Sequence, residues 1–139
     1  MSDPETVITR LYDAVWNRAD PVLADELVHE EYLIHDRELA EQLRGPELYK
    51  ALASHTEAVF PDMEFTVEET ITAGEMVALR WTMTGTHQGE LFGIPPTDQP
   101  IELSAIEINR FDGGKLIETW TQSDQLGLLQ QIGVSIEPP

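Results

Sequence analysis

The main change in the spacing of the apolar residues along this chain falls near Met63, and this change constrains the fold more than any other feature. Before Met63, apolar residues recur at the three- and four-residue spacing of amphipathic helices, apart from an extended segment over residues 29–36. After Met63 they alternate as in strands, until a last helical pattern begins at about residue 123. Helices followed by a run of strands are typical of α+β domains, in which helices pack on one face of an antiparallel sheet. We therefore expect one α+β domain over residues 1–139, with a curved antiparallel sheet wrapped around N-terminal helices as a cone-shaped barrel.

Breaker residues divide the chain into its expected elements. Asp3-Pro4 and Asp20-Pro21 each combine a capping side chain with a first-turn proline, and Gly45-Pro46 opens a third helical pattern. The segment 89–100 is too rich in glycine and proline to form an element. The expected strands and last helix cover residues 63–73, 76–87, 101–111, 115–121 and 123–131.

The chain is strongly acidic, with 26 Asp and Glu against 8 Lys and Arg and a formal net charge of -18. Such a field repels a phosphate backbone, so nucleic acid is not an expected partner. The acids are spread among apolar residues, which is typical of a surface adapted to high salt, so we expect a halophilic source. No apolar run approaches the roughly 20 residues of a membrane span. Because a signal-peptide pattern is also missing, we expect a cytoplasmic protein without membrane contact.

Polar residues on the inward parity of the strands decide whether such a cone is filled or holds a ligand. His87 shares the parity of the apolar residues of its strand, among them Trp81, and is either a satisfied core histidine or a pocket group. Glu107 and Asn109 continue the parity of Ala105, but the apolar parity switches after that residue. A bulge there would turn Glu107 to solvent, so both directions remain open.

Several stretches resemble the SnoaL-like polyketide cyclases, also called ester cyclase-like proteins. This family belongs to the cone-shaped, cystatin-like superfamily typified by nuclear transport factor two. The resemblance covers nearly the whole chain and implies the cone fold. The residues that carry it are Leu33-Ile-His35-Asp36, Phe60-Pro-Asp62, the strand ending in Thr86-His87, Gly89 to Pro96, Arg110-Phe-Asp-Gly113, Glu118, Trp120, Asp124 and Leu126 to Gly133.

The resemblance also implies a site. In the family's characterised cyclases an acidic residue is the general acid/base of an aldol ring closure without metal or other cofactor, and that role falls on Asp124. The strand parities offer Trp81 and Trp120 as apolar walls around it, and His35 and His87 remain as the candidates to stabilise the enolate or to hold a carbonyl oxygen. Glu107 departs from the family pattern, in which many members have a histidine or another pocket group. Without the resemblance, Asp124 has a simpler role as the N-cap of the last helix.

These residues lead us to expect a small-molecule enzyme, or an enzyme-like protein, with an apolar pocket for an aromatic or cyclic ketone or ester. The alternatives are a non-catalytic ligand-binding cone and an isomerase or hydrolase on the same fold, because this fold carries several activities. No pair of histidines has metal-ligand spacing, and we expect no metal site. An apolar outer face at Ile106 and Ile108 would need a cover, so we expect a homodimer.

Overall fold

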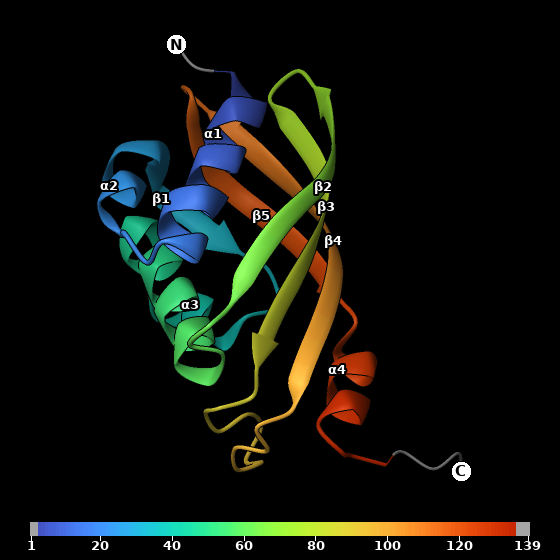
Figure 1. The fold of residues 1–139 in the computed structure, drawn as a ribbon. Helices are drawn as coiled ribbons and strands as arrows, with labels where there is room; N and C mark the ends of the chain where they lie inside the picture. Colours follow the sequence, from blue (N-terminus) through green and yellow to red (C-terminus); the bar gives the residue numbers. More distant parts are fainter. Residues whose placement is uncertain (1–2, 136–139) are drawn as a thin grey trace.

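Five strands form one curved sheet in the computed structural model, which describes residues 3–135 (Figure 1). The strand order is β1-β5-β4-β3-β2, and β2 to β5 pair antiparallel with their neighbours. β1 pairs parallel with β5, so the sheet is mixed rather than wholly antiparallel. The strands are β1 (Val28–Ile34), β2 (Glu64–Ala73), β3 (Met76–Thr86), β4 (Pro100–Asp112) and β5 (Lys115–Ser123).

The first helices lie along the open side of the curved sheet, as Figure 1 shows for α1 and α3. Asp3 begins α1 as expected, because its carboxylate accepts a hydrogen bond from the Thr6 amide at 2.8 Å. None of the helices among residues 3–135 is long and apolar enough to cross a membrane. The helical segments are α1 (Pro4–Leu11), the π-helical η1 (Tyr12–Asn17), α2 (Val22–Leu27), the 3-10 helix η2 (Glu38–Glu41), α3 (Gly45–Val59) and α4 (Gln125–Gln131).

β4 decides which side chains reach the interior. Its residues alternate between buried and exposed along the whole strand, and its register with β3 is unbroken. A bulge after Ala105, one of the two explanations of the pattern, is therefore absent, and the break in register with β5 falls between Arg110 and Phe111. Glu107 and Asn109 point inward, while Ile106 lies on the outer face with 61% of its surface exposed. The apolar parity switches because polar side chains occupy the interior here, not because the strand is irregular.

The α+β cone expected from the sequence is confirmed. Helices and a curved sheet enclose a core built from both, and the sheet stays open at its β1 and β2 edges. This arrangement gathers the inward side chains of β3, β4 and β5 opposite α1, η1 and α3.

Candidate active site

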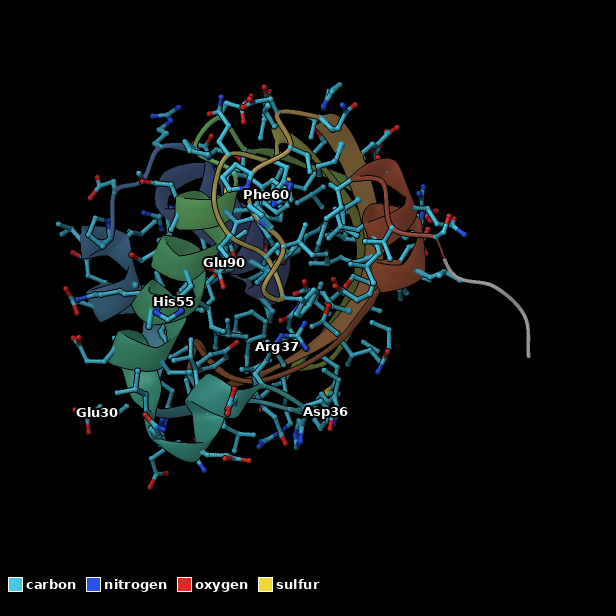
Figure 2. The ribbon with its side chains drawn as sticks, turned by 90° about the horizontal axis from the view of Figure 1, so that it is seen from below. Glu30, Asp36, Arg37, His55, Phe60 and Glu90 are labelled. Atoms are coloured by element: carbon cyan, nitrogen blue, oxygen red, sulfur yellow. The ribbon has the colours of Figure 1, made fainter. Side chains whose placement is uncertain are left out.

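A cavity of about 570 Å³ lies between the helices and the concave face of the sheet. This volume is in the range that holds a drug-sized ligand. Seen from below, the helices and the sheet form a ring, with Phe60 and Arg37 toward its interior and Glu30 on its outside (Figure 2). The aromatic lining residues are Tyr12, Trp16, Tyr32, Tyr49, Phe60, Phe65, Trp81 and Phe92. An apolar, aromatic wall of this kind suits a flat or polycyclic ligand.

Glu107 is a buried carboxylate in the lining, with 5% of its surface exposed. Its Oε1 accepts hydrogen bonds from the Tyr12 hydroxyl and from Trp81 Nε1, the latter at 2.7 Å. Within residues 3–135, Oε2 has no hydrogen-bond donor and is not fully enclosed. Two elements, η1 and β3, therefore hold one carboxylate oxygen and leave the other for a ligand.

Burial raises the pKa of Glu107 above its ordinary value of 4.5. Hydrogen-bonding groups of Tyr12, Asn109 and Trp81 oppose this rise of the pKa by stabilising the carboxylate, and the positive charge of Arg37 acts in the same direction. The result is a carboxyl group whose pKa lies closer to neutrality than that of a surface glutamate. A group of this kind can both take and return a proton.

Three further polar side chains lie beside Glu107 on the inner face. In the antiparallel register, Glu107 is opposite Thr121 and Asn109 is opposite Thr119. The Tyr32 hydroxyl donates to Thr119 Oγ1 at 3.0 Å, and the Thr119 hydroxyl donates to Asn109 Oδ1 at 2.8 Å. Within residues 3–135, Asn109 Nδ2 and Thr121 Oγ1 are buried without any hydrogen-bond partner. This corner of the cavity thus offers unused polar groups next to a carboxylate.

Arg37 brings a positive charge to the cavity lining. It follows β1, and its guanidinium donates to the backbone carbonyl of Asp36 at 3.2 Å. Among residues 3–135 it forms no ion pair, whereas Arg18, Arg80 and Arg110 each pair with an acid. The charge of Arg37 is therefore directed toward the cavity rather than neutralised by a neighbour.

Asp124 lies outside the cavity lining. Its carboxylate accepts a hydrogen bond from the Gly127 amide at 2.9 Å and caps α4. The side chain is exposed, so the apolar surroundings that the catalytic role requires do not exist around it. The structure thus places Asp124 in the helix-capping role that the residue pattern alone offered.

The two predicted histidines are also separate from the cavity lining. His87 points inward and is fully buried, but its Nδ1 meets the Thr97 hydroxyl at 2.9 Å and accepts from the Thr97 amide at 3.3 Å. It thus anchors the loop before β4. His35 lies on the outer face of the sheet, where its ring stacks on Trp120 with the ring centroids 4.8 Å apart. Its Nε2 lies 2.7 Å from Glu118 Oε2.

Trp81 lines the cavity, whereas Trp120 does not. β5 turns Trp120 outward, with 37% of its surface exposed. Its strand neighbours Thr119 and Thr121 point inward in its place. Phe92, which also lines the cavity, lies exposed in the loop at its edge.

Three residues of the site, Tyr12, Thr119 and Thr121, receive no role from the sequence pattern. Tyr12 belongs to an apolar helical stripe, where its hydroxyl carries no signal. The period of two in β5 does contain a signal, because residues flanking an outward Trp120 must point inward. Using it requires knowing which face of β5 is buried, and that depends on its partners in the sheet.

Comparisons with known proteins decide the family. The sequence model of the SnoaL-like polyketide cyclase family matches residues 6–132. The chain belongs to this family. The resemblance seen in its motifs is thereby confirmed.

Two relatives are ester cyclases by name. Nogalonic acid methyl ester cyclase of Streptomyces nogalater is 30% identical over 121 residues, which cover 84% of this chain and 86% of the relative. Aklanonic acid methyl ester cyclase DnrD of Streptomyces peucetius is 28% identical over 135 residues, covering 96% of this chain and 92% of the relative. Both matches span most of each chain, so they concern the whole cone.

Solved structures give the same fold. Wild-type IdmH of Streptomyces antibioticus superposes with a TM-score of 0.79 at 33% identity, over 96% of this chain and 100% of the other. TsrD of Streptomyces laurentii superposes with a TM-score of 0.84 at 25% identity, over 93% of each chain. The cone is thus shared with these proteins.

Proposed function

We propose that this protein closes a ring in a small ketone or ester by an intramolecular aldol reaction, with Glu107 as the general acid/base. Membership of the cyclase family supports the reaction class. The observation that carries the residue assignment is the buried Glu107 carboxylate, held through Oε1 by Tyr12 and Trp81 with Oε2 left for a ligand. A cavity of about 570 Å³ with aromatic walls suits a polycyclic substrate.

The reaction needs one proton carrier. Glu107 Oε2 takes a proton from the carbon next to a carbonyl, and the electrons of that C–H bond form an enolate. The enolate carbon attacks a second carbonyl of the same molecule, which makes the new C–C bond and an alkoxide. The proton on Glu107 then passes to the alkoxide, so product and substrate are isomers and the carboxylate is restored.

Methyl esters of nogalonic and aklanonic acid, the compounds in the relatives' names, are suitable first substrates. Ring closure is followed by chromatography with wild type, Glu107→Gln and Asp124→Asn. Loss of a general acid/base lowers the rate by about 10² to 10⁴-fold, and we expect this for Glu107→Gln. We expect Asp124→Asn to change the rate only slightly and to keep the helix cap, because the asparagine Oδ1 can still accept from the Gly127 amide.

The same experiment tests the alternative that Asp124 is the acid/base. A large loss with Asp124→Asn and full activity with Glu107→Gln would assign the role to Asp124 and reject Glu107. Circular dichroism of both variants separates a chemical defect from unfolding.

We further propose that the outer face of the sheet forms a homodimer interface. Ile106, Ile108 and Trp120 are exposed there, and apolar groups on one sheet face favour burial against a second copy. Light scattering should give twice the mass of one chain, and Ile106→Lys should shift it to the monomer. A monomer mass for wild type would reject this assembly.

A halophilic source and a cytoplasmic location stay predictions. Because screening relieves repulsion among like charges, the net charge of -18 supports a protein that is more stable in molar salt than in dilute buffer. Thermal unfolding at both salt concentrations tests the first prediction, and equal midpoints would contradict it.

A further inference from the structure

We propose that Asn109 Nδ2 binds the oxygen of the carbonyl that Glu107 enolises, so that Asn109 stabilises the enolate. This inference rests on the proposed function and adds a second catalytic residue to it. Asn109 is fully buried, lines the cavity and, within residues 3–135, has an amide nitrogen without a hydrogen-bond partner. A buried unpaired donor is costly, so one facing a cavity is expected to find its partner in a ligand.

The direction of the Asn109 amide is set by a chain of hydrogen bonds. Tyr32 gives its hydroxyl proton to Thr119 Oγ1 at 3.0 Å. The Thr119 proton is therefore turned to Asn109, whose Oδ1 accepts it at 2.8 Å. With the carbonyl end of the amide occupied, the N–H₂ end is the part left for a ligand. Tyr32 and Thr119 are buried as well, so solvent does not compete for these bonds.

The location of Asn109 fits an enolate holder. Asn109 and Glu107 lie on the same inward face of β4, two residues apart, so their side chains are neighbours along the strand. The Asn109 amide lies close enough to Glu107 to lower the pKa of the carboxyl, although within residues 3–135 no hydrogen bond of normal geometry joins the two side chains, so the amide donor stays available to a ligand. Thr121, opposite Glu107 on β5, adds a second buried hydroxyl. A carbonyl oxygen at Asn109 thus places the adjacent carbon near Glu107 Oε2, as proton removal requires.

The proposed chemistry defines the part of the substrate that binds at Asn109 and Glu107. It carries a carbonyl with a hydrogen on the adjacent carbon, and the negative charge that develops on the carbonyl oxygen shortens and strengthens its bond to Asn109. Because Asn109 is neutral, it stabilises the enolate without forming an ion pair with Glu107, which would weaken Glu107 as a base. The cavity therefore separates proton removal and charge stabilisation between two adjacent residues.

Naphthols test this inference without a known substrate, because an ionised naphthol mimics the enolate oxygen and has its own absorbance. The background is Glu107→Gln, which mimics the protonated acid. In this variant we expect the ratio of ionised to neutral bound naphthol to exceed that in Glu107→Gln/Asn109→Leu by roughly 10- to 100-fold, the range for a hydrogen bond to a charged group. No ionised naphthol in Glu107→Gln, or an equal ratio in both variants, overturns the inference.

Two further variants serve as controls. Asn109→Val in the same background has no donor and a β-branched side chain that suits a strand, so it should lose the ionised naphthol even if Asn109→Leu unfolds. Ser104→Ala alters an exposed side chain on the opposite face of β4 and should leave the ratio unchanged. Retention of ionised naphthol by folded Asn109→Val overturns the inference.

The outcome is separable from that of the proposed function. Asn109-dependent naphthol ionisation in a protein that closes no ring rejects the reaction but keeps the oxygen site. Ring closure that Asn109→Leu leaves at full rate rejects the role of Asn109 but keeps the reaction. For an enolate holder we expect kcat to fall by about tenfold or more with a small change in KM.

Discussion

The two faces of β4 and β5 each carry a glutamate, and the two glutamates differ in the groups that surround the carboxylate. On the outer face, Glu118 meets His35 Nε2 at 2.7 Å and Arg110 Nε at 2.9 Å. On the inner face, Glu107 accepts hydrogen bonds from the neutral groups of Tyr12 and Trp81. The positive charge of Arg37 also acts on Glu107, but only from beyond ion-pair distance. The outer acid is satisfied by charges of its own chain, whereas the inner acid keeps a free oxygen.

The same residue type therefore has a raised pKa on one face and a lowered pKa on the other. Burial raises the pKa of Glu107, and its hydrogen bonds only partly oppose this effect. Burial acts to raise the pKa of Glu118 too, but the hydrogen bonds and charges of His35 and Arg110 lower it below its ordinary value. Proton transfer at neutral pH suits the first environment and not the second.

Tyr12→Phe should shift the pH dependence of the reaction most, because it removes one of the two donors that hold Glu107 Oε1. The carboxylate is then less stable, the pKa of Glu107 rises further, and the acidic limb of kcat/KM moves to higher pH. On that limb we expect about a tenfold or larger loss of rate, the size of a hydrogen bond to a charged group. The pH profile of ring closure measures this change.

Tyr49→Phe is the matched control for Tyr12→Phe. Tyr49 lines the same cavity, but its hydroxyl oxygen accepts from Trp16 Nε1 at 2.8 Å and has no bond to Glu107. Its pH profile should keep the wild-type midpoint. An equal displacement of the midpoint in both variants would mean that general loosening of the cavity, and not the bond to Glu107, sets the profile.

Glu107→Gln should make the protein more stable than wild type, increasingly so as the pH rises. Below the ordinary pKa of 4.5, Glu107 is protonated in the folded and unfolded chain, and its burial costs no charge. Above 4.5, the unfolded chain releases the proton more easily than the folded one, so wild type loses stability until the raised native pKa is passed. A native pKa that lies one pH unit above the unfolded pKa corresponds to a loss of about 1.4 kcal/mol.

Urea unfolding of wild type and Glu107→Gln at pH 4 and pH 7 measures this difference. The gap between the two free energies of unfolding should be small at pH 4 and wider at pH 7. A gap that stays constant would show that Glu107 has no raised pKa in the folded protein.

The sequence predicts the fold class, but it does not predict the pairing of β1 or the direction of several site residues. The change of period at Met63 and the cap at Asp3 are local signals, and both are confirmed. The parallel pairing of β1 with β5 joins distant segments and leaves no local signal. Without that pairing the buried face of β5 is unknown, so the outward direction of Trp120 cannot be predicted from the sequence alone.

Glu107 illustrates a second reason why the sequence does not predict the direction of a site residue. Its parity points inward, but an unpaired acid in a core is unfavourable, so a bulge is an equally good explanation of the pattern. Its partners Tyr12 and Trp81 come from η1 and β3, far away in sequence. Only the assembled cone shows that the acid has donors inside, and the same assembly leaves Asp124 exposed as a helix cap.

Glu118→Gln should give the smallest effect, with the opposite dependence on pH. Because the pKa of Glu118 is lowered in the folded chain, its stabilising contribution is present above the ordinary value of 4.5 and disappears as the pH falls through the native pKa. We expect a loss of under about 1 kcal/mol at pH 7, since the partly exposed His35 and Arg110 are screened by solvent.

Glu69→Gln is the matched control for Glu118→Gln, because Glu69 pairs with Arg80 where both side chains are more than half exposed. Its loss should be close to zero at every pH. Molar salt should reduce the effect of Glu118→Gln and leave that of Glu107→Gln, which comes from burial, nearly unchanged. If Glu118→Gln instead stabilised the protein with rising pH, as Glu107→Gln should, the two faces of the sheet would not differ in how they treat a carboxylate.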